Sequence, residues 1–289
     1  MIAWGMRAEN ASYCTFELLK VHGNGGGLNI SNLGTTAHCT GNLVLNCDLY
    51  DNQDPLTLGD NYGNADGLSM AWVTHPEDVN TVRGCRFWGN SDDGVDFYNN
   101  EGLIIIEDCW AFDNGYKTGG FETAGNGFGF KWGDSADANR TVTKRISKNN
   151  VAVRNRQNGF GTNDMYGVVE MYNCTAYLNG NIGIHLADFN LNHKATNCLS
   201  YGNKVNFGAS TNGTFITNSW QNGLVVSNSD FISLDLSLLL EARQLDGSLP
   251  VTNLLRLAPT SKLINVGTNV GISYEGSAPD LGAFESGSE

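Results

Sequence analysis

The sequence has little proline, no long apolar run and a shortage of basic residues, and each of these narrows the class of protein. Five prolines against 36 glycines indicate frequent tight turns of a non-collagen kind. No segment approaches the roughly 18 consecutive apolar residues of a membrane helix, so we expect no membrane association. The formal charge of −13 argues against nucleic acid as a partner, because that partner requires clustered Lys or Arg.

Two recognisable signals are also missing. The first seven residues contain no basic segment followed by an apolar run, so we expect no signal peptide in this sequence. The five histidines lie apart and the cysteines follow a different pattern, so no zinc motif is predicted. What remains is a chain of 289 residues with 40% hydrophobic residues, which is enough to form one large folded domain.

A repeat of about two dozen residues runs through the first two thirds of the chain. Five cysteines are each followed, five positions later, by an asparagine, and Asn150 with Asn155 fits the same template. The anchors are Cys47, Cys85, Cys109, Asn150, Cys174 and Cys198. Their separations of 38, 24, 41, 24 and 24 residues indicate a basal period of 24 with two insertions. Such a period is typical of a solenoid.

Each repeat contains three short apolar-alternating runs, which predicts a three-faced, right-handed, single-stranded parallel β-helix of the all-β class. We expect residues 1–230 to form this β-helix and residues 231–289 to form its last irregular coil and a C-terminal cap over the end of the core. A closed β-helix has no free sheet edge along its length, so a monomer is expected.

The repeated residues have a structural interpretation. Equivalent positions of successive coils stack about 4.8 Å apart, so the cysteines should form an interior ladder of small apolar groups. Seven cysteines in an extracellular chain would suggest disulfides and one spare thiol, but packed free thiols are favoured over disulfides here. The asparagines predict a second ladder, in which side-chain amides bond between coils at an interior bend.

Acidic residues gather at the start of one predicted sheet. Aligning Gly67 with Gly94 puts Asp66 beside Asp93 on the neighbouring coil, with Asp92 just before it. Asp-Gly is an ordinary turn dipeptide, and for any one of these residues a turn is the simpler interpretation. The clustering makes an ordinary turn the poorer explanation. Like charges about 5 Å apart repel by roughly 3 kcal/mol per pair at an effective dielectric constant of 20, so such a group needs a compensating charge.

The same alignment puts Ser69, Asp96 and Lys131 in one outward-facing column. Four carboxylates and one amine should therefore meet on three adjacent coils, with no run of Lys or Arg to balance them. An oxygen-rich set of this kind suits a hard cation, and the flexible spacing on a sheet surface favours Ca²⁺ over Mg²⁺.

Three segments that carry these residues resemble the polysaccharide lyases of family nine, the pectate lyases with a lysine base. They are Gly-Asn-Ala-Asp-Gly at 63–67, Asn-Ser-Asp-Asp-Gly-Val-Asp at 90–96 and Gly-Phe-Gly-Phe-Lys-Trp-Gly at 127–133. The resemblance extends from about residue 10 to the end, where residues 277–285 are similar to the usual terminus of the family.

This resemblance implies a secreted, calcium-dependent enzyme that cleaves an acidic pectic polysaccharide by β-elimination. It implies the calcium ligands Asp66, Asp92, Asp93 and Asp96, with Lys131 as the base that removes the C5 proton of a uronate unit. Flanking aromatic and basic residues should bind the substrate, and the candidates are Trp132, Tyr98, Arg140 and Lys117. A lysine acts as a base only when neutral, so an alkaline optimum is expected.

Three other functions fit the predicted fold. An inverting pectin hydrolase would also use paired carboxylates such as Asp92 and Asp93, but its Gly-His-Gly and Arg-Ile-Lys elements are absent from the sequence. A non-catalytic carbohydrate-binding β-helix would use calcium only to stiffen its turns. An epimerase would need an acid opposite Lys131, and the sequence offers no candidate.

Overall fold

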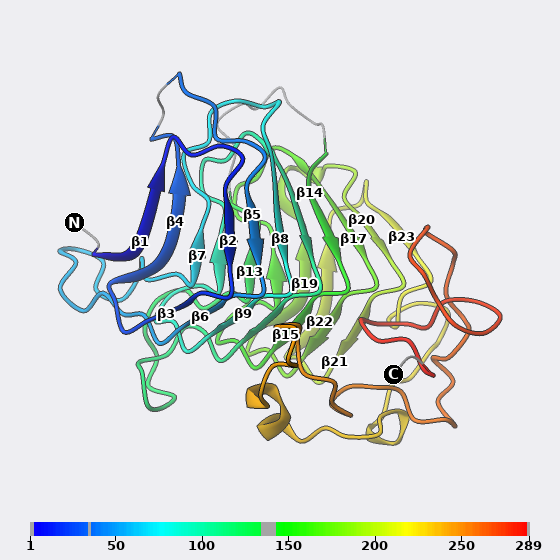
Figure 1. Ribbon diagram of the computed structural model, residues 1–289. Helices are drawn as coiled ribbons and strands as arrows, with labels where there is room; N and C mark the ends of the chain where they lie inside the picture. Colours follow the sequence, from blue (N-terminus) through cyan, green and yellow to red (C-terminus); the bar gives the residue numbers. More distant parts are fainter. Residues whose placement is uncertain (1–2, 34–35, 134–142, 288–289) are drawn as a thin grey trace.

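The computed structural model, which describes residues 3–33, 36–133 and 143–287, is a parallel β-helix with three long sheets (Figure 1). Every strand pair within these sheets is parallel, and consecutive strands of the chain belong to different sheets. The all-β solenoid predicted from the repeat is therefore confirmed. Within the described residues no helix has both the length and the apolarity needed to cross a bilayer.

The three sheets are built from the following strands. The first sheet contains β1 (Trp4–Glu9), β4 (Gly26–Ser31), β7 (Leu68–Ser69), β10 (Val95–Asp96), β13 (Phe130–Lys131), β16 (Phe160–Gly161), β19 (Ile182–Leu186) and β22 (Val205–Ala209). The second sheet contains β2 (Thr15–Glu17), β5 (Leu43–Leu45), β8 (Val79–Arg83), β11 (Leu103–Glu107), β14 (Thr143–Lys148), β17 (Val168–Tyr172), β20 (Lys194–Thr196) and β23 (Thr214–Ile216). The third sheet contains β3 (Lys20–His22), β6 (Asp48–Tyr50), β9 (Arg86–Trp88), β12 (Trp110–Phe112), β15 (Val151–Val153), β18 (Thr175–Tyr177) and β21 (Leu199–Tyr201).

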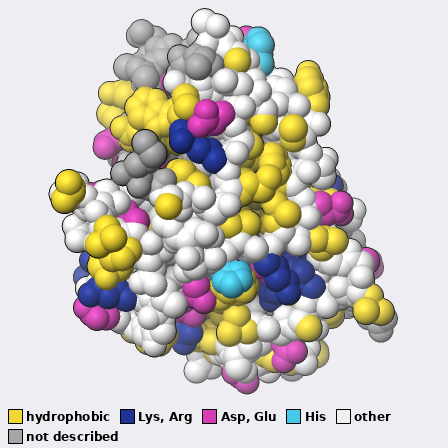
Figure 2. Space-filling model, turned by 60° about the vertical axis from the view of Figure 1, so that its left-hand side comes forward, with side chains coloured by type: hydrophobic (Ala, Val, Ile, Leu, Met, Phe, Trp, Pro, Cys, Tyr) yellow, Lys and Arg dark blue, Asp and Glu magenta, His cyan; other side chains and the backbone are white. Residues whose placement is uncertain are grey.

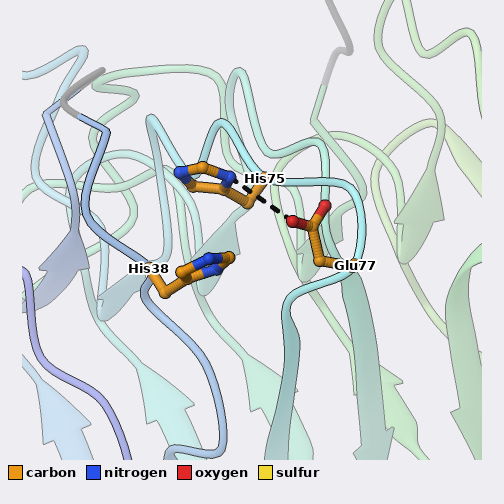
Figure 3. A group of neighbouring side chains, drawn as sticks. All are labelled: His38, His75 and Glu77. Carbon is orange, nitrogen blue, oxygen red and sulfur yellow. Dashed lines mark ion pairs between the residues drawn. The ribbon is translucent and has the colours of Figure 1, made fainter.

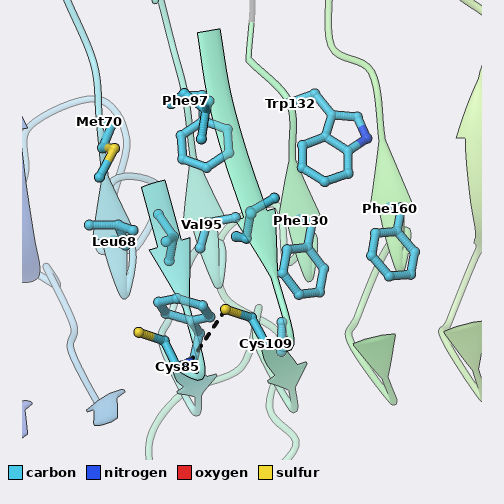
Figure 4. Close-up of a cluster of buried hydrophobic side chains, with 14 of the residues drawn as sticks. Leu68, Met70, Cys85, Val95, Phe97, Cys109, Phe130, Trp132 and Phe160 are labelled. Carbon is cyan, nitrogen blue, oxygen red and sulfur yellow. Dashed lines mark hydrogen bonds between the residues drawn. The ribbon is translucent and has the colours of Figure 1, made fainter. Parts of the chain in front are cut away.

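The core consists of inward-facing side chains stacked from coil to coil. In the first sheet, Val95 pairs with Leu68 on one side and with Phe130 on the other, and Phe130 in turn pairs with Phe160. Figure 4 shows these side chains in a row inside the solenoid, and the Phe130 and Phe160 rings stack with centroids 4.7 Å apart. Successive side chains of a strand point to opposite faces of the sheet. The residue that follows each of these core residues therefore lies on the outer face.

The two predicted ladders are present. The buried asparagines bond in series, with Asn90 Nδ2 donating to Asn114 Oδ1 at 3.0 Å and Asn114 Nδ2 donating to Asn155 Oδ1 at 2.9 Å. All seven cysteines are free, and the backbone N–H of Cys85 donates to the Cys109 sulfur at 3.4 Å (Figure 4). The expectation of packed free thiols is confirmed, and these residues belong to the scaffold.

A glycine directly precedes β7, β10, β13 and β16 of the first sheet, because the coils approach too closely there for a side chain. A Cβ on Gly94 would lie 2.5 Å from the Gly129 carbonyl oxygen and 2.9 Å from the Asn114 amide nitrogen. The glycine row and the asparagine ladder therefore fit together, and they hold the residues that come just before and after each glycine in register across the coils.

The C-terminal part of the chain packs on the outside of the solenoid. Residues 231–289 were expected to cap the end of the core, but the described part of this segment runs back along the outer side of the third sheet (Figure 1). Arg243 reaches Asp48 in β6 with an N–O distance of 2.8 Å, and Leu239 packs in the same apolar cluster as Phe112 of β12. The aromatic outer face of the third sheet explains this docking, because it would otherwise expose a large apolar surface to water.

Three 3-10 helices occur in the described residues, all in connecting or C-terminal segments. They are η1 (Asp188–Asn190), η2 (Asn228–Asp230) and η3 (Leu236–Leu240). Residue Asp235 caps η3 by accepting a hydrogen bond from the Ser237 N–H at 3.0 Å.

Candidate active site

The outer face of the first sheet brings the predicted acidic residues and the predicted base together. The strand register pairs Asp96 with Ser69 of β7 and with Lys131 of β13, as expected from the glycine alignment. Asp66 and Asp93 come directly before the glycines of their coils, so they lie at the same edge of the sheet. All of these charged side chains are buried, with Lys131 only 7% exposed.

Lys131 forms ion pairs with two carboxylates. Its Nζ lies 3.0 Å from Asp93 Oδ2 and 3.0 Å from Asp96 Oδ2, and only the second contact has hydrogen-bond geometry. One carboxylate oxygen from each of Asp66, Asp93 and Asp96 lies within 4.8 Å of the others. One ammonium therefore faces a compact group of three acids, and it leaves Asp96 Oδ1 buried without any hydrogen-bond partner.

Asp92 belongs to the wall of this group and is held by a backbone N–H. Its Oδ1 accepts a hydrogen bond from Asn126, and Asp93 Oδ1 accepts one from the Phe128 N–H at 2.7 Å. Asp66 Oδ1 accepts one from the Asp93 N–H at 3.2 Å. These bonds fix one oxygen of each acid, so the carboxylates hold their arrangement without a full set of basic partners.

The electrostatics of the cluster reflect burial and excess negative charge. Burial raises the pKa of Asp66 well above its usual range, and the neighbouring charges of Asp96, Asp92 and Asp93 raise it further. The pKa of Asp92 is also raised well above normal and that of Asp93 is raised, in both cases mainly by burial. The cluster therefore binds protons, or another cation, more readily than exposed carboxylates do.

The pKa of Lys131 moves in the same direction. Burial acts to lower it, but the charges of Asp93, Asp96, Asp92 and Asp66 outweigh burial, so the pKa lies above its usual range. With the acids ionised and unbalanced, Lys131 is an ammonium ion that cannot accept a proton. Base catalysis at this position requires further positive charge near the carboxylates.

The cluster opens into a cavity of 390 Å³ on the outer side of the N-terminal coils. Both insertions of the repeat contribute to its wall, the first through Asp60 and Asn64 and the second through Asn126. Lys and Arg side chains on the face shown in Figure 2 lie in separate groups rather than in one basic patch.

The four predicted substrate-binding residues differ in their position relative to the cavity. Tyr98 lines the cavity, is 40% exposed and packs edge-on against Trp72 with ring centroids 5.4 Å apart. Lys117 does not line it; this side chain pairs with Glu122 and lies 5.1 Å from the centre of the Tyr62 ring. Arg140 falls outside the described residues.

The prediction for Trp132 is wrong. Its side chain is fully buried in the core between Phe97, Phe130 and Phe160, as Figure 4 shows, and cannot touch a sugar. The reason is the alternation of a strand: Lys131 faces outward, so the next residue faces inward.

Sequence reasoning missed the part of the site that comes from the first coils. Trp4 and Arg7 of β1 line the cavity, and the strand register places Arg7 in the same outward column as Asn29, Ser69 and Asp96. Arg7 also pairs with Glu9 at 2.7 Å. Extending the column of aligned positions from Ser69 toward the N-terminus would have found Arg7. The repeat gave no alignment there, because β1 lies before the first Cys-Asn repeat.

Comparison with known proteins gives a consistent picture. Residues 1–197 match the family model described as the Pel9A-like, right-handed β-helix region. The chain is 41% identical over 95% of its length to pectate lyase L of Dickeya dadantii (strain 3937), and 32% identical over 83% of its length to pectate lyase L of Paenibacillus polymyxa (strain SC2). It spans 62% and 53% of the length of these two relatives.

Two solved structures share the fold. The crystal structure of pectate lyase Pel9A superposes with a TM-score of 0.79 at 35% identity, covering 98% of this chain and 69% of that one. A rhamnogalacturonan lyase superposes with a TM-score of 0.72 at 28% identity, covering 90% of this chain and 66% of that one.

Proposed function

This chain belongs to the Pel9A-like family of right-handed β-helix proteins, and from that premise we propose that it is a calcium-dependent pectate lyase. Its substrate is an acidic pectic polysaccharide such as polygalacturonate, which it cleaves by β-elimination to 4,5-unsaturated oligogalacturonides. The observation that carries the proposal is the placement of Lys131 beside three clustered carboxylates at the floor of an open cavity.

The donor set supports calcium as the cation. It consists only of carboxylate oxygens, and hard oxygen donors at flexible spacing suit Ca²⁺. Asp96 Oδ1 is buried without a hydrogen-bond partner, so one oxygen of the group is left free to bind an ion. The pKa values of Asp66 and Asp93 are raised mainly by burial, and the charge of Asp96 raises both further. We assign Asp66, Asp92, Asp93 and Asp96 as the residues that would hold the ion.

The reaction follows from the position of Lys131. When bound, Ca²⁺ supplies a Lewis acid for the carboxylate of the uronate unit and positive charge that offsets the acidic cluster. Lys131, in its neutral form, removes the C5 proton, and the C4–O bond breaks as the C4–C5 double bond forms. Asp93 and Asp96 hold the Lys131 amine in place, so the base is oriented before the substrate arrives.

The outer column of the first sheet supports a binding mode for the polymer. Arg7, Asn29, Ser69, Asp96 and Lys131 follow one another on successive rungs. With about 4.8 Å per rung, the Arg7 backbone lies roughly 19 Å from that of Lys131. We assign Arg7 to a carboxylate of a distant uronate unit.

Exposed aromatic rings beside this column would contact the sugar rings. Trp72 and Tyr98 both line the cavity and are 46% and 40% exposed, respectively. Stacking of sugar rings on these side chains would hold the chain along the first sheet.

The size of the substrate indicates where the protein acts. A polymer too large to enter a cell implies action outside it, and we propose that the protein is secreted and acts as a monomer. Enzyme activity in the culture medium rather than in the cell fraction, together with a monomer mass by light scattering, would support both points. Activity confined to the cell fraction, or a stable dimer, would contradict them.

The test of the proposed function is the product. Polygalacturonate incubated with the protein and calcium should give a rising ultraviolet absorbance from the new double bond, and a chelator should abolish the rise. Rhamnogalacturonan tested in parallel determines the preferred polymer, since a relative of that activity shares the fold. Release of reducing sugar without ultraviolet absorbance would identify a hydrolase and refute the proposal, whereas no cleavage of either polymer would favour a carbohydrate-binding role.

A further inference from the structure

We propose that His38, His75 and Glu77 form a transition-metal site that joins two neighbouring turns of the β-helix, separate from the acidic cluster. His38 lies in the connection between β4 and β5, and the other two lie between β7 and β8. One ligand atom from each of the three lies within 4.8 Å of the others. Figure 3 shows the two rings one above the other, with the Glu77 carboxylate beside them.

Hydrogen bonds to acceptors determine which nitrogen of each ring is free. His38 Nδ1 lies 2.8 Å from the buried carboxylate of Asp78, so Nδ1 carries the hydrogen and Nε2 keeps its lone pair. His75 Nε2 lies 3.1 Å from the Thr36 carbonyl oxygen, so Nε2 carries the hydrogen and Nδ1 keeps its lone pair. In its neutral form, each ring therefore has one nitrogen available as a metal ligand.

The contact between His75 and Glu77 favours a proton or a metal ion between the two side chains. The free Nδ1 of His75 lies 3.6 Å from Glu77 Oε1, so a lone pair faces a negatively charged oxygen. Protonation of His75 alone would satisfy this contact, but the His38 and His75 ring centroids are only 4.2 Å apart. Protonation of both rings would place two positive charges in contact, whereas one metal ion satisfies both nitrogens and the carboxylate.

The set of donors indicates the class of metal. Two imidazoles and one carboxylate suit zinc and related first-row metals, with open positions filled by water. The side chains of His38 and Glu77 are 52% and 64% exposed, so an ion can enter from solvent. Asp78, only 1% exposed, also accepts a hydrogen bond from the Cys39 N–H at 2.8 Å, and it holds the His38 ring as the outer partner of a metal-binding histidine does.

The site would brace one wall of the substrate cavity. Leu33, which follows β4, and Trp72, which follows β7, both line that cavity, and they lie on the two turns that the metal would join. A hydrogen bond from Asn32 Nδ2 to Thr74 Oγ1, at 3.1 Å, already links these turns. The contacts of His38 with Asp78 and of His75 with Thr36 link the same turns, and the metal would add one more link. This inference does not depend on the proposed lyase activity.

The experiment is zinc titration calorimetry on the full chain, with millimolar calcium present to occupy the acidic cluster. We expect one zinc ion per chain, and a higher melting temperature once zinc is bound. His75→Gln and Glu77→Gln should each weaken zinc binding, and Asp78→Asn should weaken it by about 10–100-fold because it removes the outer partner. His22→Gln, on the third sheet, and Asp93→Asn, in the acidic cluster, are controls that should leave zinc binding unchanged.

A spectroscopic measurement identifies the ligands without any substitution. Copper(II) bound to the native chain at a one-to-one ratio should give an electron paramagnetic resonance spectrum with two coordinated imidazole nitrogens. Failure of the native chain to bind zinc at micromolar concentrations, zinc affinity unchanged in both His75→Gln and Glu77→Gln, or loss of zinc binding in Asp93→Asn would overturn the proposal.

Discussion

The first and third sheets of the same solenoid both bury acidic residues on their outer faces, but they balance the charge in opposite ways. In the third sheet, Asp48 is 4% exposed and receives bonds from Arg86 and from Arg243. Burial acts to raise the pKa of Asp48, but the hydrogen bonds from the two arginines outweigh it, so the pKa is lowered. In the first sheet, Asp66 and its neighbours share one lysine, and the pKa of Asp66 is raised.

This difference distinguishes a structural charge from the charges of the proposed calcium site. Asp48 has two cations of the protein's own, and the C-terminal segment that carries Arg243 covers it. The acidic cluster lacks such partners and opens into a cavity. Burial alone therefore says little about the role of a carboxylate; the balance of charge around it is more informative.

The largest expected effect is that of removing Lys131, the proposed base. Lys131→Ala should lower the rate of polygalacturonate cleavage by at least about 10²–10⁴-fold, the usual contribution of a positioned proton-transfer group. The measurement is the initial rate of ultraviolet absorbance increase at saturating calcium. Lys117→Ala is the matched control, because Lys117 does not line the cavity, and it should retain nearly full activity. Comparable losses in both variants would count against Lys131 as the base.

A change in the third sheet should affect stability instead. Asp48→Asn leaves Arg86 and Arg243 without their carboxylate, and breaking a buried ion pair in this way destabilises a protein by about 3–5 kcal/mol. Chemical denaturation should detect this loss of unfolding free energy, while the cleavage rate per folded molecule stays unchanged. A variant with native stability would show that Asp48 is not the structural charge described above.

The same substitution in the first sheet should have the opposite sign. Asp66→Asn removes one unmatched charge from the cluster, so without calcium it should raise the free energy of unfolding, by on the order of 1 kcal/mol. Activity should fall, since a proposed calcium ligand is lost. Parallel denaturation of Asp66→Asn and Asp48→Asn in chelator compares the two sheets directly, and destabilisation of both by similar amounts would remove the distinction between them.

The dependence of stability on pH should separate the sheets further. A carboxyl with a raised pKa in the folded state binds more protons there than in the unfolded chain, so its contribution to stability falls as pH rises above about 4. Asp48, with a lowered pKa, contributes stability that is lost as pH falls below about 4. In chelator, the melting temperature should therefore be higher at pH 5 than at pH 8, and calcium should reduce this difference. An equal melting temperature at both values, with or without calcium, would contradict the charge imbalance.

The pH dependence of the rate follows from the pKa of Lys131. Because that pKa is raised, the neutral amine is scarce at neutral pH, and the rate at saturating calcium should increase as pH rises into the alkaline range. A pH–rate profile of the native enzyme checks this. High activity maintained under acidic conditions would exclude Lys131 as the base.

The features that recur from coil to coil could be predicted from the sequence. The Cys-Asn spacing predicted both ladders, and the glycine alignment predicted the column that joins Ser69, Asp96 and Lys131. These succeed because each coil places equivalent residues in equivalent environments, so one register determines the rest.

Features without a repeat could not be predicted in the same way. The contact of Arg243 with Asp48 joins residues 195 positions apart and leaves no periodic signal, so the path of the C-terminal segment could not be predicted from the repeat. Likewise, the histidines of the proposed metal site are separated in the sequence, and only the stacking of two irregular turns brings His38 and His75 together. Trp132 was different, since strand alternation would have placed it in the core.

The most direct test of the unbalanced acidic cluster is calcium titration calorimetry on the native chain, Asp93→Asn and Asp48→Asn, each in the presence of unsaturated oligogalacturonate. The account predicts that the native chain and Asp48→Asn bind calcium with similar affinity and that Asp93→Asn loses most of that affinity. Calcium binding that is equally strong in Asp93→Asn, or absent from the native chain, would contradict it.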